Sequence, residues 1–153
     1  MPLLNRITLA VTLWAGACHA RDRAATPPRL WVFSGGETGP FCLLLRDDST
    51  GLFYSGFVSH NPVHWRYDRS AHRLDLTLEH LSADDYFVLK DNLARGYFLA
   101  LDTASGTVSY ALNPDAPAIN LFNWVLVPVK DLKDWQLRSA REGCPPLGSS
   151  GGA

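Results

Sequence analysis

The chain has 153 residues, a length that suits one domain with a substantial core. Its formal net charge is −1 and its pI is about 6.5, so charge gives no reason to expect nucleic acid or an anionic membrane surface as a partner. The sequence also has no basic stripe interleaved with aromatic residues, the pattern typical of single-stranded nucleic-acid binding.

The first 20 residues have the layout of a signal peptide. Arg6 precedes an uncharged run over 7–17, which is followed by small residues and then by charged ones from Arg21 onward. The run is too short to span a bilayer, which takes roughly 20 apolar residues. We therefore expect an exported protein in which 1–20 is the signal peptide and 21–29 is a tether.

The stretch 15–18, Ala-Gly-Ala-Cys, resembles a bacterial lipobox, in which small residues precede a cysteine that is lipidated and becomes the mature N-terminus. It departs from the commonest pattern, because alanine stands first where leucine is usual. The resemblance implies a lipid anchor through Cys18 and, because His19 rather than aspartate follows, the outer membrane as the destination. The alternative is ordinary signal-peptidase cleavage after Ala17 or Ala20, which would leave a periplasmic protein.

Two cysteines remain for the folded domain, Cys42 and Cys144. An even number of cysteines in an exported domain favours a disulfide bond. Closing a loop of roughly 100 residues would contribute about 4–5 kcal/mol in the chain-entropy model. The bond would fasten the C-terminal segment to an early strand.

From Leu30 onward, short aromatic and β-branched runs alternate with Gly, Asp, Ser and Asn. In chain order, the expected strands are 30–33, 41–46, 51–58, 63–67, 73–79, 86–90, 97–102, 107–112 and 119–127. Their number and spacing predict one all-β domain over 30–144, an antiparallel meander of about eight or nine strands that forms a small barrel, with a sandwich as the alternative. Helical spacing in 131–143 predicts a short C-terminal helix that closes one barrel end. We expect 145–153 to be a disordered tail.

The hairpin formed by 63–67 and 73–79 can be given a register, because a turn at 70–71 satisfies both of its faces. The opposed pairs are Tyr67–Leu74 and Trp65–Leu76 on an apolar face, and Arg66–Asp75 and Asp68–Arg73 on a charged face. A second hairpin, with its turn over 104–107, sets Leu101 near Val108 and Leu99 near Tyr110.

The first register also predicts a binding site at the end of the sheet away from the turn. It puts His80 opposite Asn61 and beside His60, with His64 and Trp65 further along the same strand. Imidazoles at one barrel mouth could bind an anionic ligand, a partner, or a divalent metal such as zinc or copper, for which His60, His64 and His80 are the candidates. The alternative is a rim of surface histidines. Since histidines change charge near neutral pH, binding at this rim should depend on pH.

The sequence has no nucleophile elbow or phosphate-binding loop and leaves no free cysteine for a Cys/His site, so we expect neither an enzyme nor a cofactor. It looks like small periplasmic or surface-anchored β-barrel lipoproteins, a broad type with unrelated functions. We expect a non-enzymatic binding module that inhibits or caps a protein partner in the cell envelope, such as a hydrolase or a toxin. The alternatives are a carrier with an apolar ligand inside the barrel and a weak metal-binding protein.

Overall fold

The computed structural model describes residues 27–33, 41–55, 59–134 and 144. The expected signal peptide, the lipobox and the C-terminal tail lie outside these residues, as does most of the helix expected over 131–143. Of the expected tether only 27–29 is described, and the carbonyl of Arg29 accepts a hydrogen bond from the amide of Leu45 at 2.7 Å. In the described part of the chain, no helix is both long enough and apolar enough to cross a membrane.

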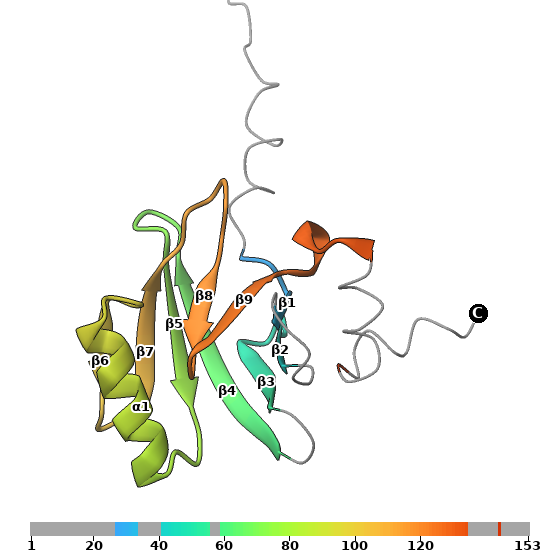
Figure 1. Cartoon of the computed structure of the whole chain (residues 1–153). Helices are drawn as coiled ribbons and strands as arrows, with labels where there is room; N and C mark the ends of the chain where they lie inside the picture. Colours follow the sequence, from blue (N-terminus) through green and yellow to red (C-terminus); the bar gives the residue numbers. More distant parts are fainter. Residues whose placement is uncertain (1–26, 34–40, 56–58, 135–143, 145–153) are drawn as a thin grey trace, which may run out of the picture.

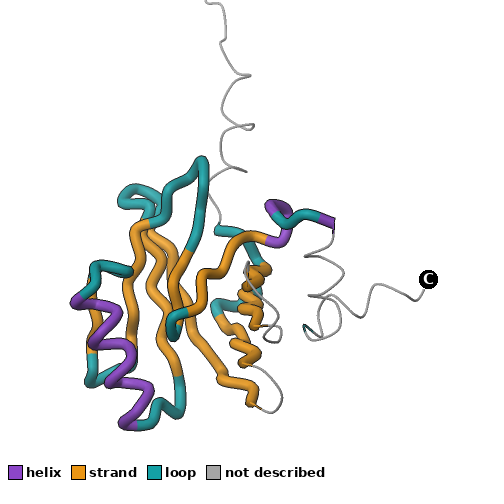
Figure 2. Tube along the Cα trace, viewed as in Figure 1, coloured by secondary structure: helices purple, strands orange, loops and turns teal. Residues whose placement is uncertain are grey.

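Within the described residues, nine strands and one α-helix form a single antiparallel sheet with the helix beside it (Figure 1). The elements are β1 (Leu30–Phe33), β2 (Phe41–Leu45), β3 (Thr50–Ser55), β4 (Ser59–Asp68), β5 (Arg73–Leu78), α1 (Ala83–Ala94), β6 (Ala100–Asp102), β7 (Thr107–Ala111), β8 (Ile119–Leu121), β9 (Trp124–Pro128) and a 3-10 turn, η2 (Val129–Asp131). The sheet curls into a half-barrel (Figure 2), which confirms the predicted all-β, barrel-like fold.

The strand order departs from a pure meander at both ends of the sheet. Strands β1 to β5 pair in sequence order and β9 returns to pair with β1, but β5 pairs with β7, which leaves β6 and β8 as the two edges. The side chain of Tyr110 links β7 to β8, because its hydroxyl donates a hydrogen bond to the carbonyl of Asn120 at 2.9 Å. Burial raises the pKa of Tyr110, so its hydroxyl keeps the proton that it donates.

Both predicted hairpin registers are observed. The ladder between β4 and β5 contains all four expected pairs, two of them charged and two apolar. In the second hairpin Leu101 pairs with Val108, and the amide of Leu99 donates to the carbonyl of Ser109. Where two faces of a hairpin constrain it at once, local sequence is sufficient to determine the register.

The strand expected at 86–90 is wrong, because these residues lie inside α1. The helix begins at a capping box: the Ser82 hydroxyl accepts from the Asp85 amide at 3.1 Å, and the Asp85 carboxylate accepts from the Ser82 amide at 2.8 Å. Leu89 then points into the core. The expected strand 97–102 is correspondingly reduced to the three residues of β6.

The single long strand expected at 119–127 is also wrong. The chain reverses at Phe122 and Asn123, whose φ angles are 50° and 68°, and so makes a tight hairpin between β8 and β9. Positive φ at both turn residues is typical of type I′ hairpin turns, but it is rare for a residue as bulky as phenylalanine. The Phe122 ring packs against Phe53, with 5.9 Å between centroids, which places it on the main core.

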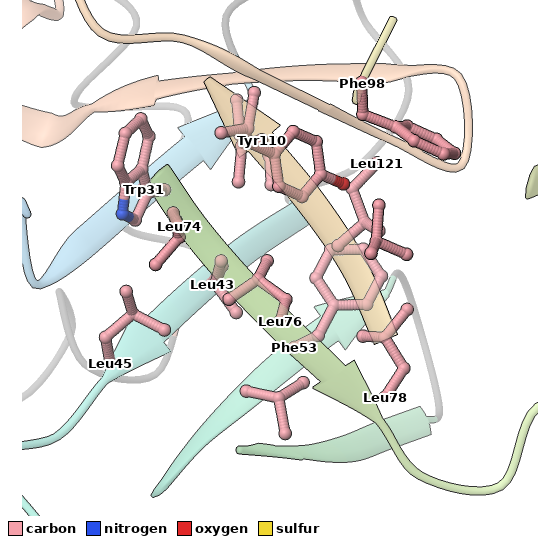
Figure 3. Packing of buried hydrophobic residues seen from close by; sticks show 14 of the residues in the cluster. Trp31, Leu43, Leu45, Phe53, Leu74, Leu76, Leu78, Phe98, Tyr110 and Leu121 are labelled. Atoms are coloured by element: carbon pink, nitrogen blue, oxygen red, sulfur yellow. The ribbon is translucent and has the colours of Figure 1, made fainter. Parts of the chain in front are cut away.

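The concave side of the sheet is filled by one apolar core, part of which is drawn in Figure 3. Helix α1 and eight of the nine described strands contribute buried residues to this core, and the half-buried Leu101 of β6 packs against it. On the outer side of β1 and β2, Val32 and Cys42 form a second, smaller buried cluster together with Cys144. Cys42 and Cys144 form the predicted disulfide, with 6.0 Å between their Cα atoms, and both are fully buried. The bond thus holds Cys144 against the outer side of β1 and β2.

Candidate binding surface

Side chains alternate between the two faces of a strand, so the residues of β4, β5 and β7 that do not fill the core face outward. These three strands are adjacent in the sheet. We use the name outer polar face for the following set: His64, Arg66, Arg73, Asp75, Thr77, Glu79, Thr107 and Ser109. Two groups of contacts organise it, one around Glu79 and one around Asp75.

The first group, which we call the histidine cluster, contains His64, Glu79 and His80. Nε2 of His64 lies 2.9 Å from Oε1 of Glu79, and Nε2 of His80 lies 3.6 Å from Oε2 of the same carboxylate. The amide of Glu79 donates to the carbonyl of Pro62 at 3.1 Å, which keeps the carboxylate beside β4. One carboxylate therefore lies between two exposed imidazoles.

His80 contacts the same carboxylate as His64, and the expected backbone pair of His80 with Asn61 is not part of the ladder. The ladder between β4 and β5 ends at Val63 and Leu78, and His80 has a φ of 57°, at the point where the chain leaves β5 for α1. Asn61 has a ladder partner on the other side of β4, in β3. The side chain of His60 lies outside the described residues.

Trp65 does not lie on the same face of the sheet as the histidine cluster. As the neighbour of His64 in β4 it faces the other side of the sheet, where its indole Nε1 donates to the carbonyl of Arg46 at 2.9 Å. The guanidinium of Arg29 lies 5.1 Å from the Trp65 ring centroid and also pairs with Asp47. The structure therefore separates Trp65 from the histidine cluster.

The second group, the arginine network, is built on a buried carboxylate. Asp75 is only 8% exposed and accepts four hydrogen bonds: Nε and Nη2 of Arg73 at 2.8 and 3.1 Å, Nη2 of Arg66 at 3.0 Å, and the Ser109 hydroxyl at 2.7 Å. Burial raises the pKa of Asp75, but the hydrogen bonds from Arg73, Ser109 and Arg66 outweigh it and hold the pKa at about 2. The carboxylate is therefore ionised near neutral pH and fixes both guanidinium groups.

Among residues 27–33, 41–55, 59–134 and 144, no group of three or more His, Cys, Asp or Glu side chains is arranged to hold a metal ion. The hypothesis of a metal site on His60, His64 and His80 depends on one side chain outside these ranges and stays a prediction.

Sequence reasoning missed Glu79 and Ser109. Glu79 has the same strand parity as Asp75, so alternation along β5 could have placed it on the outer face beside His64. Ser109 could not have been found in this way, because its contact with Asp75 depends on the pairing of β5 with β7, and the segment between those strands was expected to contribute a strand of its own.

Comparison with known proteins found no family model, no curated protein and no solved structure that matches the chain.

Proposed function

We propose that this chain is an exported protein of the bacterial cell envelope that binds a protein partner, such as a hydrolase or a toxin, and inhibits or caps it without catalysis. The observation that carries the proposal is the outer polar face, where charged side chains are fixed against one another on adjacent strands of a packed sheet. Side chains that are already ordered lose little conformational entropy when a partner docks. Arginine is also enriched among the residues that dominate binding at protein interfaces.

The filled interior supports binding at a surface over the alternative of an apolar ligand carried inside the barrel. Trp31, Leu74 and Leu76 are fully buried on the concave side and pack with the other core residues (Figure 3). A small barrel has room for its own side chains or for one small ligand. Here side chains from strands across the whole sheet occupy that side.

The disulfide between Cys42 and Cys144 is compatible with export to an oxidising compartment. We propose in addition that Cys18 carries a lipid anchor. Radiolabelled palmitate should then be incorporated when the full chain is expressed in a bacterial host, and Cys18→Ala should abolish the label. An unlabelled protein whose mature N-terminus is Arg21 would contradict lipidation and indicate ordinary signal-peptidase cleavage.

The binding proposal is tested by affinity capture from envelope extract of the bacterium that encodes the chain, followed by an activity assay of the captured protein. The bait is compared with His64→Ala/His80→Ala and with the control His72→Ala, which changes an exposed histidine in the turn between β4 and β5. We expect the double variant to lose at least about tenfold in affinity, while its melting temperature stays within about two degrees, because exposed residues seldom contribute much stability.

The control should bind as the unmodified chain does, and the captured hydrolase or toxin should lose activity when the chain is added. Capture of no partner, or equal capture by the double variant and the control, would contradict this function. A strong loss of stability in the double variant would mean that these histidines have a structural role.

A further inference from the structure

Helix α1 holds a large apolar side chain on the face opposite the core. Leu89 is fully buried in the core, whereas Phe87, two positions earlier, is 75% exposed. At 3.6 residues per turn, two positions correspond to about 200° around the helix axis, so Phe87 points away from the core. The packing of α1 on the core therefore does not account for this ring.

Two more exposed apolar side chains, Tyr97 and Leu99, lie in the segment between α1 and β6. Strand β6 is an edge of the sheet, and α1 lies alongside it (Figure 1). We call the exposed side chains of residues 83–102 the helix–edge surface. Of the four large hydrophobic side chains that are exposed in the described part of the chain, three belong to this surface. Apolar groups that gather in one region and have polar neighbours are typical of protein interaction sites.

The helix–edge surface is acidic. Residues 83–102 contain four aspartates and two cationic side chains, a net charge of −2, although the whole chain has a net charge of only −1. The ion pair between Asp91 and Arg95 compensates one carboxylate. Asp84 is exposed, and no residue in the described part of the chain forms an ion pair with it. Asp102 accepts hydrogen bonds from a hydroxyl and a backbone amide, which lower its pKa and leave its charge uncompensated. The adjacent strand β7 has no charged side chain that could compensate it.

We infer that the contact with the protein partner extends from the histidine cluster over the helix–edge surface, and that the partner presents a basic face with an apolar centre that covers Phe87. This inference rests on the proposed function and specifies the chemistry of the partner. The two regions adjoin, because His80 lies two positions before Ser82, the N-cap of α1. Lys or Arg side chains of the partner would pair with Asp84 and Asp102, and an arginine can also lie over the Phe87 ring.

The acidic charge decides between the possible occupants of this exposed apolar face. An anionic lipid surface and a nucleic acid would both be repelled by it. A second copy of the chain would bring the same net charge of −2 to a two-fold interface, so that like charges would lie close together. A basic protein face gains from the apolar contact and from the complementary charge at once.

The test uses the exported full chain, labelled with 15N, and a synthetic peptide of alternating lysine and glycine with a central leucine as the probe. We expect the backbone amide signals of 83–102 to shift and saturate during titration at low salt. Phe87→Ser and Asp84→Asn should each weaken the apparent affinity at least about fivefold, because each removes one half of the proposed recognition. The matched control, Asp131→Asn, removes one exposed carboxylate from η2, which contacts β1, and should leave the affinity unchanged.

No shift with the basic peptide, an equal shift with the corresponding glutamate–glycine peptide, or equal weakening by Asp131→Asn would overturn the inference. It would also be overturned if sedimentation showed a dimer that Phe87→Ser dissociates, because a second copy would then be the occupant. Binding of phosphatidylglycerol vesicles that depends on Phe87, without a response to the peptide, would replace the basic protein face by a lipid surface.

Capture from envelope extract separates this inference from the proposed function. If the captured partner is lost in the histidine double variant but retained by Phe87→Ser and by Asp84→Asn, this inference fails and the proposed function stands. If the peptide binds through Phe87 and Asp84 but no envelope partner exists, the proposed function fails instead.

Discussion

Replacing Asp75 with asparagine removes the central charge of the arginine network and keeps the size of the side chain. The pKa of Asp75 is about 2 in the folded chain, against an ordinary value of 3.8. At 1.36 kcal/mol for each pKa unit, this difference corresponds to roughly 2 kcal/mol of unfolding free energy at neutral pH. Asp75 is itself buried, but its partners Arg66 and Arg73 are 78% and 46% exposed, so solvent screens part of the interaction and roughly 2 kcal/mol is an upper value. For a domain of this size the melting temperature should fall by about 4–8 °C.

The effect has a defined pH dependence. A carboxyl group whose pKa is lower in the folded state stabilises the fold above its unfolded pKa, and this contribution is lost as pH falls through the folded pKa. Urea unfolding of the unmodified chain and of Asp75→Asn should therefore differ by up to roughly 2 kcal/mol at pH 7 and at pH 5. The difference should shrink to about half by pH 3 and approach zero near pH 2.

The control for this experiment is Asp47→Asn, which removes a carboxylate that is 91% exposed and pairs with Arg29. Exposed ion pairs contribute little, so this change should cost less than about 1 kcal/mol at any pH. A difference between the unmodified chain and Asp75→Asn that stays constant from pH 7 to pH 3 would refute the reasoning, because the loss would then not come from the ionised carboxylate. Equal effects of the two substitutions would refute it as well.

Three further substitutions test how the sheet is closed and packed. Cys144→Ser removes the disulfide and should lower the unfolding free energy by up to about 4–5 kcal/mol. The same loss should follow when reductant is added to the unmodified chain. A urea midpoint that reductant leaves unchanged would contradict this prediction. Tyr110→Phe leaves the carbonyl of Asn120 without its donor and should cost about 1–3 kcal/mol in thermal unfolding; a neutral result would mean that this bond does not hold β7 to β8. Gly51→Ala places a Cβ 2.8 Å from Cγ2 of Val63 and against the backbone of β2, and should cost about 1–3 kcal/mol; combining it with Val63→Ala should not restore stability, since the backbone contact remains.

The features that the sequence predicted correctly are those determined by several constraints at once. The hairpin of β4 and β5 satisfies charge pairing on one face and apolar burial on the other, so only one register fits. The disulfide follows from the number of cysteines and the export signal, without any knowledge of the fold. His64 and His80 contact one carboxylate, that of Glu79, which the sequence reasoning did not include, and a binding role of these histidines stays a prediction.

The errors arise where local preference and tertiary context disagree. Residues 86–90, Tyr-Phe-Val-Leu-Lys, favour a strand by their side chains, whereas the capping box that starts the helix lies upstream at Ser82. The turn at Phe122 carries no glycine, so nothing in its composition marks a positive φ. The pairing of β5 with β7 skips the helix and an edge strand, and sequence periodicity holds no information about such long-range order.

The pairing of β1 with β9 also bears on the order in which the chain can fold. Trp31 pairs with Pro128, and the disulfide links cysteines 102 positions apart, whereas β2 to β5 each pair with the strand that follows or precedes them. Contacts between distant residues form slowly, because a long loop must close first. The meander of β1 to β5 can therefore form early, while the outer edge of β1 is still unpaired because β9 comes later in the chain. An unpaired strand edge is a template for pairing with other molecules, so a chain that ends before β9 should aggregate even though most of its sheet is intact.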